Sequence, residues 1–141
     1  MQFTLRACEV GKGNCTDFHS LFISLARASG IPARFEMGVP LPEDTASGPI
    51  PGYHCWAEFF LEGRGWIRVD ASEAWKHPEL HEQYFGTYVP NRLQFVTGRD
   101  LVLSARHEST PLNLWIAPYV EVDGKPLDEV KALFSFAALQ P

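Results

Sequence analysis

The chain has 141 residues, 45% apolar and 21% charged, which is the balance of a folded globular protein and excludes a disordered one. Its formal net charge is −5 and it has no run of Lys or Arg, which excludes nucleic acid as a partner because phosphates are bound by basic surfaces. No apolar run approaches the roughly 20 residues that span a bilayer, and residues 1–6 lack a signal-peptide layout, so we expect no membrane association and a cytoplasmic location. The length predicts a single domain over residues 1–141.

The three cysteines, Cys8, Cys15 and Cys55, cannot all pair with one another, and none has the spacing Cys-x-x-Cys. We therefore expect a reducing compartment. In an oxidising compartment a bridge between Cys8 and Cys55 is the alternative.

The segment 11–19, Gly-Lys-Gly-Asn-Cys-Thr-Asp-Phe-His, leads from a glycine-bearing turn into an amphipathic helix that we expect over residues 16–29. Cys15 would lie in its first turn, where unpaired backbone N–H groups and the helix dipole stabilise a thiolate and lower a pKa that is ordinarily about 8.5. A buried structural cysteine is the alternative interpretation. The helical spacing is carried by Phe18, Leu21, Phe22, Leu25 and Ala26, and Gly30-Ile31-Pro32 ends the helix.

Strand patterns follow the helix. Alternating apolar residues predict a strand near residues 35–39, and the hydrophobic runs 53–61 and 66–70 predict a hairpin. Between them, the Pro- and Gly-rich segment 40–52 predicts a loop, either a rim over the site or a plain connection. Further on we expect an irregular or short helical crossover at 73–86 and antiparallel strands at 91–97, 101–105 and 112–122, while 127–139 has both helical and strand periodicity.

Three residues of this part of the chain make a catalytic set. A nucleophilic thiol needs a base within hydrogen-bond reach and a third group that orients the base. Cys15, His54 and Asp70 occur in that order, with His54 and Asp70 on the two strands of the predicted hairpin.

The hairpin allows a geometric check of this set. A symmetric four-residue loop would place His54 and Asp70 on opposite faces, because side chains alternate along a strand. A three-residue loop at 62–64, with Gly65 in a bulge, would place Asp70 opposite Trp56 and make His54 a diagonal neighbour on the same face. A catalytic His–Asp pair therefore predicts the three-residue loop.

Four motifs in order resemble the core of the transglutaminase-like superfamily, within the papain-like cysteine-enzyme fold. They are Gly-Asn-Cys-Thr-Asp-Phe at 13–18, Ala-Arg-Ala-Ser-Gly-Ile-Pro-Ala-Arg at 26–34, Tyr-His-Cys-Trp-Ala-Glu at 53–58 and Gly-Trp-Ile-Arg-Val-Asp at 65–70. The resemblance implies an α+β fold in which an N-terminal helix carrying the cysteine packs on an antiparallel β-sheet. The motif-bearing core would cover about residues 11–75, with further strands at about 91–122.

The resemblance also implies a mechanism. Cys15 would be the nucleophile, His54 the base and Asp70 its orienting partner in acyl transfer or hydrolysis at amide bonds of peptides or proteins, with no cofactor and no metal. The backbone N–H of Cys15 is the natural oxyanion donor, and Asn14, Tyr53 and Trp56 are further candidates for the oxyanion hole or cleft. Relatives carry more helical sequence before the cysteine than the 14 residues present here. The chain is therefore expected to be a minimal member, a truncated one, or a homo-oligomer in which another subunit completes the cleft.

The sequence leaves several alternatives open. The fold could serve as a non-catalytic domain that binds a peptide or protein. His19, one helical turn after Cys15, could act as the base or form a metal site with Cys15 and Cys8. Asp70 could simply cap the turn that follows it. Trp56 and Trp66 fit the core better than a substrate platform.

Overall fold

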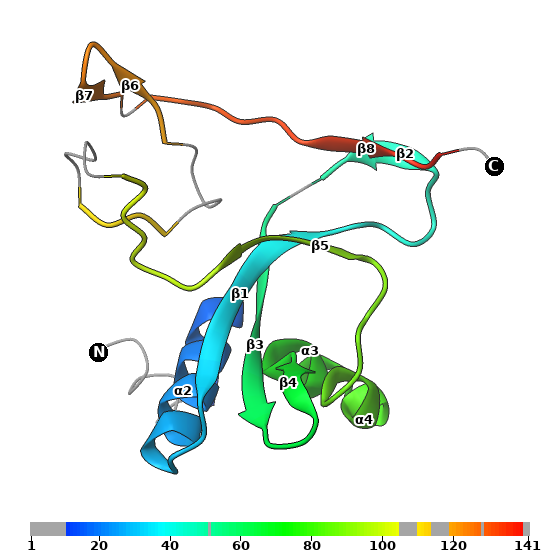
Figure 1. Cartoon of the computed structure of the whole chain (residues 1–141). Coiled ribbons are helices and arrows are strands. Elements are labelled where there is room, and N and C mark those ends of the chain that lie inside the picture. The colour runs from blue at the N-terminus through cyan, green and yellow to red at the C-terminus, as the bar shows by residue number, and fades with distance from the viewer. Residues whose placement is uncertain (1–10, 51, 105–109, 114–118, 128, 140–141) are drawn as a thin grey trace. The chain divides into compact units, whose positions relative to one another are not determined.

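The structure is a computed structural model that describes residues 11–50, 52–104, 110–113, 119–127 and 129–139 (Figure 1). The chain divides into two compact units. The first comprises Met1–Glu36 and His54–Pro90, and the second comprises Met37–Tyr53 and Asn91–Pro141. Within the described residues, none of the helices has both the length and the apolar character required to cross a membrane.

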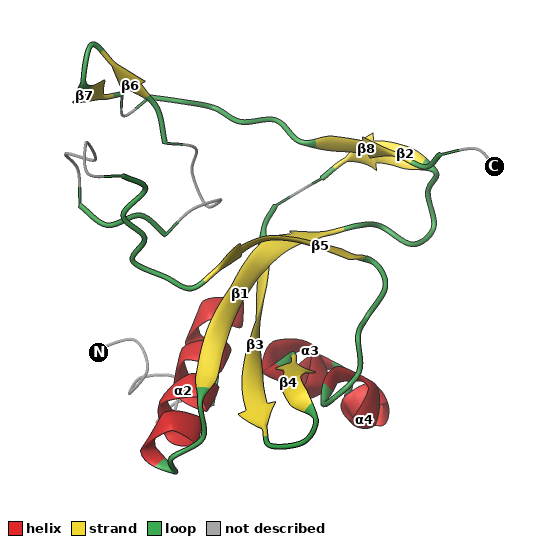
Figure 2. Cartoon of the chain, viewed as in Figure 1, coloured by secondary structure: helices red, strands yellow, loops and turns green. Residues whose placement is uncertain are grey.

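The first unit contains the motif-bearing segments and combines helices with strands (Figure 2). Helix α2 packs against strand β3, and a group of short helices follows strand β4. The elements of this unit are α2 (Cys15–Ala28), β3 (His54–Leu61), β4 (Gly65–Val69), α3 (Ala71–Lys76), the 3-10 turn η1 (Pro78–Leu80) and α4 (His81–Tyr84).

Helix α2 begins one residue earlier than the periodicity predicts, at Cys15 itself. Asn14 caps it: the Asn14 side chain accepts a hydrogen bond from the Asp17 N–H, and the Asp17 carboxylate accepts one from the Asn14 N–H. This reciprocal arrangement satisfies two backbone donors that a helix start otherwise leaves without partners. At the other end, Gly30 adopts a positive φ of 77°, which favours glycine and ends the helix.

The main sheet has four strands in the order β4-β3-β1-β5, with β1 spanning Ala33–Pro40 and β5 spanning Arg92–Thr97. An N-terminal helix packed on a four-stranded antiparallel sheet confirms the predicted α+β fold class. In β1, a Cβ atom added at Gly38 would lie 2.0 Å from the Leu93 carbonyl oxygen. The backbones of residues 38 and 93 therefore lie so close that only glycine fits at position 38.

The β3–β4 hairpin has the predicted three-residue loop. Leu61 pairs with Gly65, and Ala57 pairs with Val69. Gly63 and Gly65 have φ angles of 78° and 82°, a region that residues with a side chain rarely adopt. The register required for a His54–Asp70 contact is therefore confirmed.

The second unit corrects part of the predicted segment 40–52. This segment is not entirely loop, because Ser47–Pro49 forms strand β2 and pairs with β8, Ser135–Ala137. Proline is tolerated here because the sheet has only two strands, so each is an edge strand. Of the two periodicities in the segment 127–139, the strand periodicity therefore matches the structure at residues 135–137, which form a strand and not a helix.

The strands predicted between residues 101 and 122 are shorter than expected in the part that the structure describes. Leu101 forms an isolated bridge with Leu112, and the only regular pairing described there joins β6 (Glu121–Val122) to β7 (Lys125–Pro126). Pro111 cannot donate to a ladder, which limits pairing beside Leu112. Residues 105–109 and 114–118 lie outside the described part of the chain.

Candidate active site

Cys15 is the first residue of α2, and the capping network holds it in place. It is half-buried, and its thiol is not in a disulfide. A Cβ atom added at Gly13 would lie 2.7 Å from the Cβ of Asp17, so a larger residue there would displace the carboxylate that completes the cap. The residues around Cys15 therefore determine where α2 begins and, with it, where the Cys15 thiol lies.

His54 and Asp70 are joined by a hydrogen bond. The His54 Nε2 atom lies 2.6 Å from Asp70 Oδ2, and the two side chains are largely buried, with 12% and 3% of their surfaces exposed. An ionised carboxylate only accepts hydrogen bonds, so Nε2 carries the proton and donates. His54 Nδ1 is then the ring atom that can exchange a proton with a thiol.

Asp70 has further partners that hold its carboxylate still. Its Oδ1 atom accepts hydrogen bonds from the Ser72 hydroxyl at 2.9 Å and from the Glu73 N–H at 3.0 Å, and the latter caps helix α3. Asp70 therefore also caps the segment that follows it, as the alternative interpretation of this residue expected. One oxygen caps the helix while the other accepts from His54.

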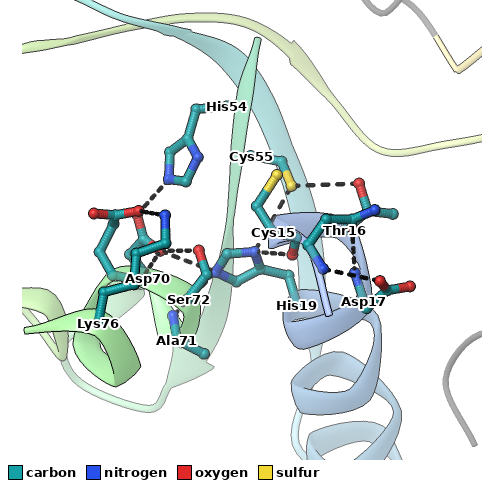
Figure 3. A network of polar contacts seen from close by, with 12 residues as sticks. Cys15, Thr16, Asp17, His19, His54, Cys55, Asp70, Ala71, Ser72 and Lys76 are labelled. Carbon is teal, nitrogen blue, oxygen red and sulfur yellow. Dashed lines mark hydrogen bonds and ion pairs between the residues drawn. The ribbon is translucent and has the colours of Figure 1, made fainter. Parts of the chain in front are cut away.

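The three predicted residues come together at the start of α2 and the ends of β3 and β4 that face it (Figure 3). The surroundings lower the pKa of the Cys15 thiol from its ordinary value to about 4. The largest cause is a side-chain hydrogen bond from Cys55, and a hydrogen bond and the charge of His54 also lower this pKa, while burial raises it. At neutral pH Cys15 is therefore a thiolate.

His19 lies beneath this group and is completely buried. Its Nε2 atom accepts a hydrogen bond from the Ala71 N–H at 3.0 Å, so the ring proton is on Nδ1, which donates to the Cys15 carbonyl oxygen at 2.5 Å. Both ring nitrogens are thus engaged with backbone. His19 ties the start of α2 to the residue after Asp70, a role that its spacing from Cys15 alone does not indicate.

Cys55 is a residue of the site whose role the sequence analysis missed. It is completely buried, and its Sγ atom lies 3.7 Å from Thr16 Oγ1 and 3.7 Å from His19 Nδ1. A hydrogen bond to Cys15, burial and the Cys15 charge raise the pKa of the Cys55 thiol, so it remains protonated. The signal in the sequence was the alternation of strand side chains, which directs the residue after His54 to the opposite face.

The other cleft candidates differ in where they lie. Trp56 is completely buried beneath the Arg68 guanidinium, 5.1 Å from the ring centroid, and is a core residue. Asn14 is exposed, and its side-chain oxygen caps α2. Tyr53 is half-buried and directly precedes β3. The Cys15 N–H belongs to the first residue of α2, and such a group has no acceptor within its own helix.

Among the residues that the structure describes, no cluster of three or more His, Cys, Asp or Glu side chains is arranged to hold a metal ion. Cys8, the third member of the alternative metal site, lies outside the described residues. The arrangement of Cys15, His54 and Asp70 is instead one that can generate a thiolate and move a proton beside it.

Comparison with known proteins agrees with this geometry. Residues 3–71 match the model of the transglutaminase-like superfamily, a span that includes Cys15, His54 and Asp70. The match supports the resemblance of this part of the chain to the superfamily, whose members are generally cysteine-based enzymes. No solved structure matches the chain.

The chain is also similar to an uncharacterized protein of Haemophilus influenzae. The two are 33% identical over 147 residues, an alignment that covers 83% of this chain and 40% of the relative. The chain thus spans less than half the length of this relative.

Proposed function

We propose that the protein is a cysteine enzyme that acts on amide bonds of peptides or proteins through a thioester acyl-enzyme. The observation that carries the proposal is the hydrogen bond of 2.6 Å between His54 and Asp70. The hairpin has the strand register that such a pair requires, and the neighbouring Cys15 thiol has a lowered pKa. This is the set of nucleophile, base and orienting group that thiol-dependent acyl transfer needs.

In the acylation step, the Cys15 thiolate attacks the carbonyl carbon of the substrate and a C–S bond forms. The negative charge that develops on the carbonyl oxygen is stabilised by the Cys15 N–H and the positive end of α2. The C–N bond then breaks, and His54, which holds the proton lost by the thiol, donates it to the departing amine. Asp70 stabilises the imidazolium and keeps its ring in the productive orientation.

In the second step, an amine or water attacks the thioester. His54 takes a proton from the attacking group, the C–S bond breaks, and the thiolate of Cys15 is restored. An amine yields a new amide bond, and water yields a carboxylic acid. Both outcomes use the same three side chains.

The test is turnover of an unstructured peptide pool, with and without a primary amine, read by mass spectrometry. Cys15→Ala and His54→Ala should each abolish turnover while retaining the circular dichroism spectrum of the wild type. Trp75→Ala is a matched control, because this exposed aromatic lies on α3 and is not part of the set. Full turnover in His54→Ala would contradict the assignment of the base, and turnover in Cys15→Ala would contradict the mechanism.

A further inference from the structure

A second thiol lies beside the proposed nucleophile, and the proposed mechanism does not use it covalently. The Cys15 and Cys55 side chains come from α2 and β3, and their sulfur atoms lie next to each other in Figure 3. Both cysteines are free, and a hydrogen bond links the two side chains. The Thr16 hydroxyl and the His19 ring, each 3.7 Å from the Cys55 sulfur, hold that thiol in this position.

From this juxtaposition we infer that Cys15 and Cys55 form a reversible oxidation site, in which a hydroperoxide oxidises Cys15 and Cys55 then closes a disulfide with it. The inference rests on the proposed function in one respect, that Cys15 is a reactive nucleophile. It adds a modification site and a way to protect that nucleophile.

The first step is oxidation of the nucleophile. The Cys15 thiolate attacks one oxygen of hydrogen peroxide, an S–O bond forms, the O–O bond breaks, and hydroxide leaves. Cys15 becomes a sulfenic acid, and the peroxide is reduced by two electrons. Cys15 is half-buried and so can be reached by a molecule of this size, whereas Cys55 is completely buried.

The second step is closure of the disulfide. The Cys55 sulfur attacks the sulfenic sulfur of Cys15, an S–S bond forms, and the S–O bond breaks. The departing hydroxide takes the Cys55 proton, so one water is released. An S–S bond is about 2.05 Å long, so closure requires the two neighbouring sulfur atoms to approach each other.

Charge favours this order of events. In the reduced protein, the hydrogen bond to Cys15 and the negative charge of Cys15 are among the causes that raise the pKa of the Cys55 thiol. Oxidation of Cys15 to a neutral sulfenic acid removes that charge. Cys55 therefore loses its proton more readily once Cys15 is oxidised, and stays protonated while Cys15 is available for acyl transfer.

Trypsin separates the three cysteines, which makes the disulfide directly measurable. Cleavage after Lys and Arg places Cys15 in peptide 13–27, Cys55 in peptide 35–64 and Cys8 in peptide 7–12. The full chain, wild type and Cys8→Ser, is treated with a small excess of hydrogen peroxide, alkylated and digested without reductant. Cys55→Ser is the matched variant.

We expect a linked 13–27/35–64 peptide in the wild type and in Cys8→Ser, lost on treatment with dithiothreitol. In Cys55→Ser this linkage is absent, dimedone traps the sulfenic acid of Cys15, and further peroxide converts Cys15 to sulfinic acid that dithiothreitol does not reverse. Conversion of wild-type Cys15 to sulfinic acid without the linked peptide would overturn the inference, whether or not Cys55→Ser folds.

Failure of the proposed function would look different. A linked peptide from a protein that turns over no amide would leave the oxidation site standing and contradict the enzyme. Amide turnover without the linked peptide would contradict the oxidation site alone.

Discussion

The Asp70 side chain has two roles at this site, one for each oxygen of its carboxylate. Its Oδ2 atom accepts from His54, while its Oδ1 atom accepts from Ser72 and from the first turn of α3. The helix cap thus fixes the carboxylate that orients the base. Stability and the proposed chemistry depend on different oxygens of the same residue, and substitutions can separate them.

Asp70→Asn and Asp70→Ala should therefore behave differently. Asparagine is as good a helix cap as aspartate, so Asp70→Asn should unfold close to the wild-type temperature, whereas Asp70→Ala should lose about 1 kcal/mol of stability with the cap. Both should lose turnover by about 10²–10⁴-fold, because neither holds His54 with an ionised partner. Thermal unfolding and peptide turnover check the two expectations.

Wild-type turnover in Asp70→Asn would show that the carboxylate only caps α3. Equal stability of Asp70→Ala and the wild type would show that the cap contributes nothing. The two outcomes are independent of each other.

At the scale of elements, the β3–β4 hairpin decides whether a His–Asp pair exists. Leu61 pairs with Gly65 around a three-residue loop, which brings His54 and Asp70 to the same face. A slip of one residue would turn every side chain of one strand to the other face. Gly65 permits the observed register because its φ of 82° is open to glycine at little cost.

Gly65→Ala should therefore destabilise the protein by roughly 1–2 kcal/mol, since alanine is strained at this φ. It should also reduce turnover, because the strain is relieved by moving the hairpin that carries His54 and Asp70. Gly52→Ala is the matched control: a Cβ atom there meets nothing within 4 Å, and Gly52 lacks a positive φ. Urea unfolding of the two variants measures the difference.

Equal stability of the two glycine variants would contradict the importance of this turn. Loss of stability in Gly65→Ala with full turnover would mean that strain at the loop does not reach the His54–Asp70 pair.

The elements that could be predicted are those whose signals are local. Asn14 and Asp17, which cap the start of α2, lie within four residues of each other. Residues 62–65 indicate a hairpin, although the sequence leaves two loop lengths open and the structure decides between them. The β2–β8 pairing could not be predicted, because the paired residues Gly48 and Phe136 are separated by more than half of the chain. Such contacts depend on tertiary structure rather than on local pattern.

The same distinction applies to the site. Cys15, His54 and Asp70 follow from motif order and strand alternation. Cys55 and His19 do not, because their roles come from packing between α2 and β3: a buried thiol contacts a buried ring across elements that are distant in sequence. Strand alternation places Cys55 on the face opposite to His54, but composition and spacing do not show which helix residues meet that face.

At the scale of the whole molecule, the three proposed catalytic residues all belong to one compact unit, which joins Met1–Glu36 to His54–Pro90. The family match, residues 3–71, falls largely on the same unit. The single domain predicted from the length stays a prediction, as does a homo-oligomer that completes the cleft. The proposed chemistry uses residues of the first unit alone.

The most direct test of this account is the rate at which iodoacetamide alkylates Cys15 as a function of pH, read by mass spectrometry in the wild type and in His54→Ala. In the wild type the rate should rise as pH passes through about 4 and should be level by neutral pH, because the thiolate is the reactive form. In His54→Ala the midpoint should move to higher pH, since the hydrogen bond and charge of His54 are lost. A wild-type midpoint near the ordinary value of about 8.5, unchanged in His54→Ala, would contradict the Cys15–His54 pair and the enzyme built on it.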